Sequence, residues 1–286
     1  MKPTAATVVC GIIGDPVEHS MSPAMQNAAF EAAGIDWVYV AFRVDRELLS
    51  AAVAGVRALG LRGLNVTVPH KVDIMSYLDS IDPVARRIGA VNTIVNESSH
   101  LRGYNTDAAG FTHALETGGV DVAGRRVVVL GAGGGARAVV YSLADLGAVP
   151  VIVNRTPERA EALAADVTRD TGVDAAGSVL TPSTLDELAR SAVLIVNTTS
   201  VGMSPHVEAS PCPSAILRRD LAVCDIVYNP LRTALIRDAG ATGARTISGV
   251  EMLVGQGARA FELWTGLGAP VDVMRRAVLT ELGHGA

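Results

Sequence analysis

Four polar clusters in the sequence are expected to lie at the ends of β-strands. In an open α/β sheet, ligands bind where the strands end, so these clusters are candidates for a common binding site. Two of their side chains carry a charge that could serve in proton transfer, Lys71 and Asp107. The clusters are HSMSP (19–23), NVTVPHK (65–71), the pair GAVNTI (89–94) and GYNTD (103–107), and VYNP (227–230).

The chemistry of these clusters suits a small polyhydroxylated carboxylate. Hydroxyl groups bind a carboxylate without adding a full charge, and amides can fix ring hydroxyls. The sequence has no His-rich or Cys-rich spacing typical of a metal site, so we expect no metal. Hydride transfer to a ketone would then need a proton donor from the protein, and Lys71 paired with Asp107 is the candidate. The expected ligand-binding side chains are those of Ser20, Ser22, Thr67, Asn92 and Tyr228.

Each of these residues also has an ordinary structural alternative. A lysine after a strand is usually a solvated surface residue, which is the alternative for Lys71. Asp107 stands directly before a helical stretch at 108–116 and could cap it, a role that is compatible with catalysis. His19 and His70 are expected to be structural and to hydrogen-bond the backbone at the turns. The catalytic interpretation rests on the occurrence of the clusters together.

A nucleotide-binding motif lies in VVVLGAGGGARA (127–138). Gly131, Gly133 and Ala136 fit the pattern G-x-G-x-x-G/A, directly after a predicted strand and at the start of a predicted helix. The first glycine permits a tight turn, the second leaves room for a pyrophosphate, and the third small residue lets helix and strand pack closely. Free N–H groups at the helix N-terminus would then face the phosphates. The motif predicts a dinucleotide cofactor.

The residues after the next strand favour NADP over NAD. An acidic residue usually stands there to bind the ribose 2′-hydroxyl of NAD, but this chain has Asn154, Arg155 and Thr156. Arg159 lies four residues after Arg155 and shares its face if a helix begins at Thr156. Two guanidinium groups suit a 2′-phosphate. The alternative is that both arginines are solvated, with Glu158 neutralising one of them.

The elements that must position these residues alternate between strand and helix and predict an α/β fold with mostly parallel sheets. The helix at 22–34 is expected to have Ser22 as its N-cap, Pro23 at its first position and Gly34 past its end. A second unit is expected from about residue 107, because the glycine motif needs its own βαβαβ unit. Strands are expected within 8–14, 37–44, 61–68, 124–130, 150–154, 191–200 and 221–230, and further helices within 46–60, 132–147, 156–167 and after 249.

Composition and charge restrict the class of protein. The chain has 286 residues, 49% of them hydrophobic, and a net charge of −5 with both signs interspersed, which gives no support to a nucleic-acid partner. Its apolar runs fall short of the roughly 20 residues of a membrane span, and its N-terminus is a weak match to a signal peptide. The three cysteines form no CxxC pair and are expected to be free thiols in a reducing cytoplasm.

Over essentially its full length the chain resembles the shikimate dehydrogenase family. So many motifs in a fixed order are highly specific together. The matching stretches are GDPVEHSMSPAMQNAAF, NVTVPHK, IGAVNTI, GYNTDAAGF, GAGGGARA, NRT, NTTSVGM, DIVYNP and GVEMLVGQGARAFELWTG.

The resemblance implies a fold and a reaction. Residues 1–106 would form an α/β substrate-binding domain, 107–249 a Rossmann NADP-binding domain, and 250–286 C-terminal helices that pack on the first domain. The enzyme would reversibly reduce 3-dehydroshikimate to shikimate with NADPH in the shikimate pathway to aromatic amino acids. It would act in the cytoplasm as a monomer or homodimer.

The resemblance also implies roles for single residues. Lys71 and Asp107 would form the catalytic pair, with Asp107 orienting the amine of Lys71. The carboxylate would bind Ser20 and Ser22, and the substrate would also contact Thr67, Asn92, Tyr228 and Gln256. The cofactor would contact Gly131, Gly133, Gly134, Gly135, Ala136, Asn154, Arg155, Thr156, Arg159 and Gly249, the last of these near the nicotinamide.

Two positions depart from the family pattern, and three rival functions stay open. Gln26 stands where the family usually has histidine, and Gly135 replaces the more usual alanine; we expect both to be tolerated. The nearest rival function is an NAD-dependent quinate/shikimate dehydrogenase, followed by an aminoshikimate dehydrogenase. The third rival is a non-catalytic NADP-binding regulator, which the presence of both Lys71 and Asp107 disfavours.

Overall fold

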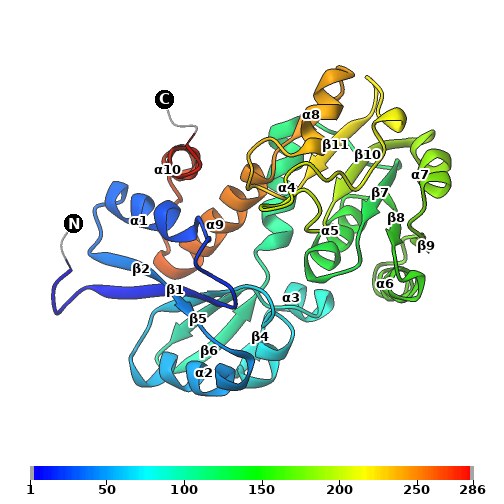
Figure 1. The fold of residues 1–286 in the computed structure, drawn as a ribbon. Helices are drawn as coiled ribbons and strands as arrows, with labels where there is room; N and C mark the ends of the chain where they lie inside the picture. Colours follow the sequence, from blue (N-terminus) through cyan, green and yellow to red (C-terminus); the bar gives the residue numbers. More distant parts are fainter. Residues whose placement is uncertain (1–2, 284–286) are drawn as a thin grey trace. The chain divides into compact units, whose positions relative to one another are not determined.

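A computed structural model describes residues 3–283 and divides the chain into two compact units (Figure 1). The first unit contains the chain up to Thr106 and again from Val254, and the second contains Asp107–Leu253. Each unit has its own six-stranded sheet with helices packed on it. The predicted α/β class is therefore confirmed. No helix among the described residues is long and apolar enough to cross a membrane.

The sheet of the first unit has the order β2-β1-β3-β5-β6-β4. Strand β1 pairs in parallel with β2 and β3, as predicted. Strand β5 alone is reversed, since it runs antiparallel to both β3 and β6, and β4 pairs in parallel with β6. The prediction of a mostly parallel sheet is therefore confirmed, with β5 as the exception. The strands are β1 (Val8–Gly14), β2 (Trp37–Arg43), β3 (Gly63–Val66), β4 (Ser80–Ile81), β5 (Thr93–Glu97) and β6 (His100–Tyr104).

A tight hairpin joins β5 to β6. Glu97 pairs with His100, so only Ser98 and Ser99 form the turn, and both have positive φ values of 56° and 74°. Two consecutive left-handed residues match the twist of a hairpin, which explains why so short a turn is compatible with the sheet. The hairpin returns the chain to the level of Thr93, so the residues just before β5 and just after β6 lie side by side.

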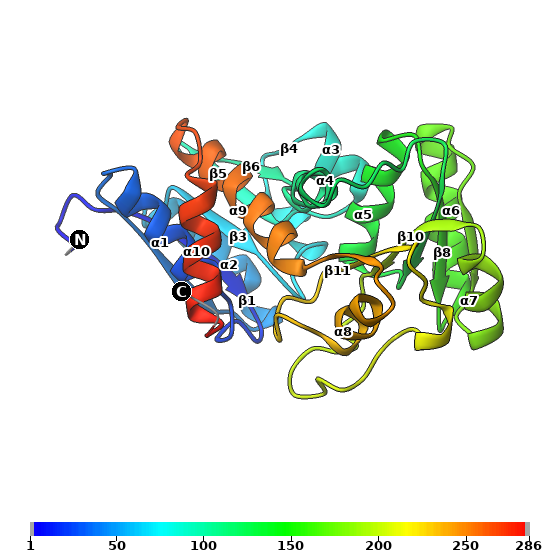
Figure 2. The ribbon, with the colours of Figure 1, turned by 90° about the horizontal axis from the view of Figure 1, so that it is seen from above.

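Helices cover both faces of this sheet. On one face a core of buried aliphatic side chains, including Val53, Leu64, Ile74 and Ile94, joins the sheet to α2. On the other face Phe30 of α1 stacks on Phe261 of α9, and α10 packs on α1 (Figure 2). The helices of this unit are α1 (Ser22–Ala32), α2 (Leu49–Ala58), α3 (Pro83–Ile88) and α10 (Val271–Glu281), with most of α9 (Gly249–Thr265).

The sheet of the second unit is parallel throughout and has the order β12-β11-β10-β7-β8-β9. The chain passes from β7 to β8 on one side and returns to β10 on the other side. This reversal of strand order is the point at which doubly wound sheets bind nucleotides. The strands are β7 (Arg126–Leu130), β8 (Val149–Asn154), β9 (Ala176–Val179), β10 (Ala192–Asn197), β11 (Ala222–Asp225) and β12 (Arg245–Ile247).

Alternating side chains of β7 attach helices to the two faces of this sheet. Val128 and Leu130 pack in one core with Leu185 of α7 and Leu235 of α8. Because successive side chains of a strand point to opposite faces, Val127 faces the other side of the sheet. The helices of this unit are α4 (Asp107–Gly118), α5 (Gly134–Asp145), α6 (Pro157–Thr171), α7 (Pro182–Ala189) and α8 (Ala234–Ala241).

Candidate active site

The two serines predicted to bind a carboxylate lie at the start of α1. Ser22 is buried and is the first residue of the helix, so the prediction that it is the N-cap is wrong. Met21 takes the N-cap position and provides no side-chain hydrogen bond. Instead, the hydroxyl of Ser20 accepts the backbone N–H of Ser22 over 3.2 Å. Ser20 therefore satisfies part of the helix N-terminus from outside it, and both hydroxyls lie at that end.

Lys71 lies in the turn after β3 and is held there by backbone hydrogen bonds. The N–H of His70 donates to the carbonyl of Thr67 over 3.0 Å, and the carbonyl of Lys71 accepts the N–H of Val91 over 2.8 Å. His70 is fully buried, and its Nε2 donates to the carbonyl of Val44 over 2.7 Å, which confirms its structural role. Because Val91 precedes Asn92, the bond from Lys71 places the lysine backbone next to Asn92.

Asn92 is buried, and hydrogen bonds fix its amide group. Its Oδ1 accepts the backbone N–H of Thr106 over 2.7 Å and lies 3.1 Å from the hydroxyl oxygens of Thr93 and Thr106. The hydroxyl of Thr106 also lies 3.5 Å from Oε1 of Gln256 on α9. Thr106 thus connects two of the predicted substrate-binding amides, Asn92 and Gln256, within the first unit.

Two residues that were not predicted from the sequence, Tyr39 and Asn65, connect the start of α1 to Asn92. The hydroxyl of Tyr39 donates to Oδ1 of Asn65 over 2.6 Å, and Nδ2 of Asn65 donates to the carbonyl of Asn92 over 3.2 Å. Burial raises the pKa of Tyr39 well above its usual value, an effect that the neighbouring Ser22 hydroxyl opposes. Tyr39 therefore stays protonated at neutral pH and can donate to Asn65. A buried polar network runs from Ser22 through Tyr39 and Asn65 to Asn92.

Only one of these two residues had a signal in the sequence. Asn65 is a polar amide inside an otherwise apolar strand, and such a residue needs hydrogen-bond partners when buried. Tyr39 lies within WVYVAF, where an aromatic side chain is ordinary for a strand. Its partner is 26 residues away in the chain, so local sequence could not identify the contact.

Asp107 opens the second unit as the first residue of α4 and is buried. It follows Thr106 directly, so its backbone begins one residue from the hydrogen bonds that fix Asn92. A carboxylate in the first turn of a helix is favoured by the partial positive charge there. The helix predicted at 108–116 is therefore confirmed, with Asp107 in its first turn.

The glycine motif forms the turn between β7 and α5, as predicted. Gly131 has a φ of +106°, which disfavours any residue with a side chain, and a Cβ there would lie 2.8 Å from the hydroxyl of Thr198. Gly133 precedes the first residue of α5 as its N-cap. Ala136 is fully buried, in agreement with the close packing of helix and strand that the motif predicts.

The start of α5 fits a pyrophosphate. A Cβ built on Gly133 or Gly134 would meet no atom within 4 Å, so these residues border open space rather than protein. A Cβ on Gly135 would come within 3.2 Å of Ile226, which limits the space on that side. An open, side-chain-free helix N-terminus with unpaired N–H groups is the environment that phosphates favour.

Two exposed arginines follow β8. Arg155 and Arg159 are exposed, and neither forms an ion pair with a carboxylate among the described residues. Nδ2 of Asn154 donates to the carbonyl of Thr156 over 2.9 Å, which shapes the turn into α6. The alternative in which Glu158 neutralises one of these arginines has no such contact in the described part of the chain. Both guanidinium groups are therefore available to donate hydrogen bonds to a phosphate.

Tyr228 lies on the segment after β11, close to Gly249. A Cβ on Gly249 would lie 2.6 Å from the carbonyl oxygens of both Ile226 and Val227, so only glycine permits this approach. Burial raises the pKa of the Tyr228 hydroxyl, which keeps it protonated at neutral pH. The structure thus brings Tyr228, Gly249 and the glycine turn into one part of the second unit.

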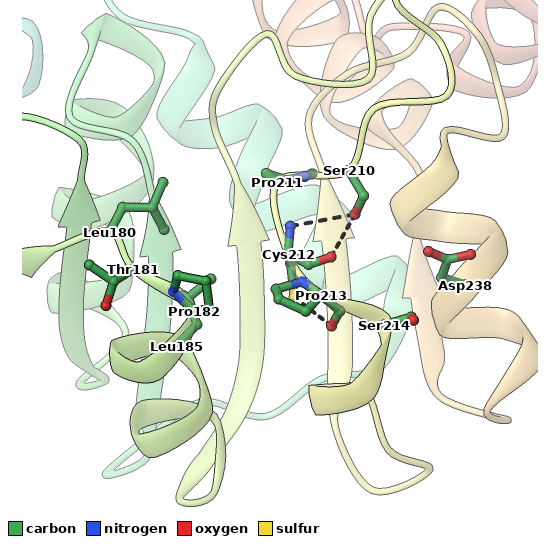
Figure 3. Close-up of a pocket in the computed structure, with 10 residues that line it drawn as sticks. All are labelled: Leu180, Thr181, Pro182, Leu185, Ser210, Pro211, Cys212, Pro213, Ser214 and Asp238. Carbon is green, nitrogen blue, oxygen red and sulfur yellow. Dashed lines mark hydrogen bonds between the residues drawn. The ribbon is translucent and has the colours of Figure 1, made fainter.

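One pocket of about 470 Å³ has no part in this arrangement. It lies in the second unit beside α7 and the segment 210–214, and none of the predicted site residues lines it (Figure 3). Within residues 3–283, no three His, Cys, Asp or Glu side chains gather as a metal site would require. The chemistry of the chain is therefore best sought in the two clusters around Asn92 and Gly131.

Three family models match consecutive parts of the chain. The shikimate dehydrogenase substrate-binding domain matches residues 12–94, and the shikimate/quinate 5-dehydrogenase model matches 113–226. The shikimate 5′-dehydrogenase C-terminal domain matches 249–279. These matches cover most of the sequence in the order that the motifs predict.

Individual relatives agree with the family models. The chain is 51% identical over 288 residues to the NADP-dependent shikimate dehydrogenase of Moorella thermoacetica, covering 98% of this chain and 95% of that protein. A crystal structure of a shikimate dehydrogenase in complex with NADP⁺ has a TM-score of 0.92 and 43% identity, covering 98% of both chains. That of the Thermus thermophilus enzyme with NADP(H) and shikimate has a TM-score of 0.87 and 41% identity, covering 96% and 99%. The chain belongs to the shikimate dehydrogenase family.

Proposed function

We propose that this protein is an NADP-dependent shikimate dehydrogenase that reversibly reduces 3-dehydroshikimate to shikimate, in the shikimate pathway to aromatic amino acids. Family membership supports the reaction class, and one local observation supports the assignment of residues. The hydrogen bonds donated by Val91 to Lys71 and by Thr106 to Asn92 hold a lysine that follows β3 near an amide that precedes β5. Asp107 comes directly after Thr106. In such an arrangement the lysine and the carboxylate can transfer a proton while the amide binds a ring hydroxyl.

The first unit is proposed to bind the substrate. Hydroxyls of Ser20 and Ser22 would donate to the carboxylate from the start of α1, where the partial positive charge of the helix also favours an anion. The amides of Asn92 and Gln256 would fix ring hydroxyls, since both are oriented by Thr106. Thr67 would complete the contacts made by this unit, and Tyr228 of the second unit is also proposed to contact the substrate.

Lys71 and Asp107 are proposed to move the proton. In the direction of reduction, the ammonium group of Lys71 would donate a proton to the carbonyl oxygen as it gains negative charge. In the direction of oxidation, the neutral amine would remove the proton of the hydroxyl. Asp107 would orient the amine through its carboxylate. The hydride is supplied or accepted by the nicotinamide of the bound cofactor.

The second unit is proposed to hold NADP. The N-terminus of α5, with Gly133, Gly134 and Gly135, would bind the pyrophosphate. Arg155 and Arg159 would pair with the 2′-phosphate, with Asn154 and Thr156 shaping the turn between them. Gly249 would lie beside the nicotinamide.

We further propose that the enzyme acts in the cytoplasm as a monomer or homodimer. Its three thiols are free and buried, and burial raises the pKa of each of them, that of Cys212 to about 12. Thiols of this kind are inert and suit a reducing compartment.

The decisive experiment is a matrix of shikimate and quinate against NADP and NAD, followed by absorbance of the reduced nicotinamide. We expect the highest kcat/KM for shikimate with NADP. A preference for quinate with NAD would instead support the quinate dehydrogenase alternative. NADPH binding without turnover of either acid would support the non-catalytic regulator.

A further inference from the structure

Asp225, at the end of β11, is a fully buried carboxylate on which three hydrogen-bond donors converge. Its Oδ1 accepts Nδ2 of Asn197 over 2.9 Å and the backbone N–H of Val227 over 3.0 Å. Its Oδ2 accepts the hydroxyl of Thr233 over 2.6 Å. No cation lies within ion-pair distance of Asp225 in the described part of the chain. Only hydrogen-bond dipoles therefore stabilise the ionised carboxylate, and burying such a charge without a counter-ion costs free energy of desolvation.

The partner Asn197, at the end of the neighbouring strand β10, is also fully buried and ties down a second segment. Its Nδ2 also donates to the carbonyl of Val201 over 3.2 Å, and its Oδ1 accepts the N–H and the hydroxyl of Thr199 over 3.0 and 2.7 Å. The segment from Thr198 to Val201 is thus folded around one side chain. Asp225 and Asn197 together fix the segments that follow two adjacent strands.

Both of these segments border the proposed NADP site within the second unit. The first segment contains Thr198, whose hydroxyl donates to the carbonyl of Leu130 over 2.6 Å and fills the space beside Gly131. The second segment contains Ile226, whose side chain lies against Gly135 and whose carbonyl lies against Gly249. Tyr228 follows two residues later. A shift of either segment would therefore move the walls around the glycine turn or displace Tyr228.

We propose that Asp225 is a positioning residue for cofactor and substrate, acting through Asn197 and the N–H of Val227; this inference rests on the proposed function. A carboxylate is the side chain suited to this place, because both of its oxygens only accept and all three neighbours donate. It connects the ends of β10 and β11 to the N-cap of α8, since Thr233 also accepts the N–H of Ile236. The positions of Tyr228 and Gly249 depend on this one buried group.

Variants at position 225 separate positioning from folding. Asp225→Ala removes all three contacts, whereas Asp225→Asn keeps an oxygen toward Asn197 and Val227 and can donate to the hydroxyl of Thr233. We expect Asp225→Ala to lower kcat about 10- to 100-fold, since a displacement on the order of 1 Å can cost that much. It should also raise the KM for shikimate and the Kd for NADPH at least fivefold. Asp225→Asn should restore all three values to within about threefold of wild type.

Val167→Ala is the matched control. This residue is buried on α6, a helix that packs on β8, β9 and α5, and its truncation should lower stability. Assayed well below its Tm, it should show unchanged KM and Kd values. If Asp225→Ala lowered only the Tm, with KM and Kd unchanged, or if Val167→Ala shifted these constants equally, Asp225 would be merely structural and the proposal wrong.

Two further measurements keep the test decisive. Tyr228→Phe should lower kcat/KM less in the Asp225→Ala background than in wild type, because a displaced tyrosine no longer makes its full contact. Equal losses would contradict the proposed route through this segment.

If Asp225→Ala does not fold, Thr233→Val should raise the Kd for NADPH and Thr233→Ser should restore it; no change in Thr233→Val would overturn the proposal. NADPH binding, followed by its fluorescence, needs no turnover. It therefore tests Asp225 even if shikimate is not the substrate.

Discussion

The backbone N–H of Thr106 donates to Oδ1 of Asn92 over 2.7 Å, and this bond decides which end of the amide faces which way. A backbone N–H can only donate, so the atom that it meets must be the oxygen. The NH₂ group of Asn92 consequently points away from the N–H of Thr106. Thr106, which fixes this orientation, is joined to Asp107 by a peptide bond. One short stretch of chain therefore helps to position both the amide of Asn92 and the carboxylate of Asp107.

Replacing Lys71 by alanine should remove most turnover. Loss of a positioned acid–base group costs about 10²- to 10⁴-fold in kcat, while the Kd for shikimate should stay within about tenfold. Lys71→Arg is the matched control, since arginine keeps the charge but does not release a proton near neutral pH. It should therefore be nearly as slow as Lys71→Ala. Single-turnover and steady-state rates should be measured for both variants. A near-normal kcat in either variant would contradict proton transfer by Lys71.

The two serines should both contribute to substrate binding, and each should contribute to stability through a different hydrogen bond. Ser20→Ala and Ser22→Ala each remove a hydrogen bond to a charged group, worth about 1.5–3 kcal/mol, and should raise the KM for shikimate. Ser20→Ala also removes the acceptor for the N–H of Ser22, and Ser22→Ala also removes the buried contact with Tyr39; each loss should cost about 1 kcal/mol of unfolding free energy. Urea unfolding beside steady-state kinetics distinguishes the two effects. An unchanged KM in both variants would place the carboxylate elsewhere.

Removing both exposed arginines should erase the preference for NADP. In wild type we expect kcat/KM for NADP to exceed that for NAD by about tens to thousands-fold, equivalent to roughly two charge-assisted hydrogen bonds. Replacing Arg155 and Arg159 with alanine should raise the KM for NADP and leave activity with NAD nearly unchanged. Arg169→Ala on the same helix is the control, because Arg169 already pairs with Asp166 and Asp170. Equal losses with both cofactors would show that the arginines do not bind the 2′-phosphate.

Asp225 should make the stability of the protein depend on pH. Burial raises its pKa in the folded state above the usual 3.8, although its three hydrogen bonds oppose the shift. The folded state then holds this proton more tightly than the unfolded state, so the contribution to stability falls as pH rises from about 4 to the folded-state pKa. Asp225→Asn lacks this titration. Urea unfolding of both proteins between pH 4 and 7 should show wild type losing stability relative to the variant, and a constant or opposite difference would contradict the raised pKa.

Local sequence predicted the elements whose signals are contained within one segment. The turn at Gly131, the helix that follows it and the helices after Gly249 are all present, because glycine geometry and helical periodicity act over a few residues. The motif order also indicated the family and its cofactor, both of which the relatives confirm.

Features that depend on pairing between distant residues were not predicted. The antiparallel hairpin of β5 and β6 was missed, since its turn uses Ser98 and Ser99 rather than the usual glycine or asparagine. The contact of Tyr39 with Asn65 depends on which strands are neighbours in the sheet. The N-cap of α1 was misassigned by one residue, because Ser20 and Ser22 both suit that position and only the backbone path decides between them.

The first unit is assembled from two stretches of chain that lie on either side of the second unit in the sequence. Trp264, from the later stretch, donates its Nε1–H to the carbonyl of Ile94 in the earlier stretch over 2.9 Å and is itself buried. During synthesis on the ribosome, the second unit can therefore fold as soon as it has emerged, while the first must wait for α9 and α10. Of the two units, the one proposed to bind shikimate is the first whose translation begins and the second to be completed.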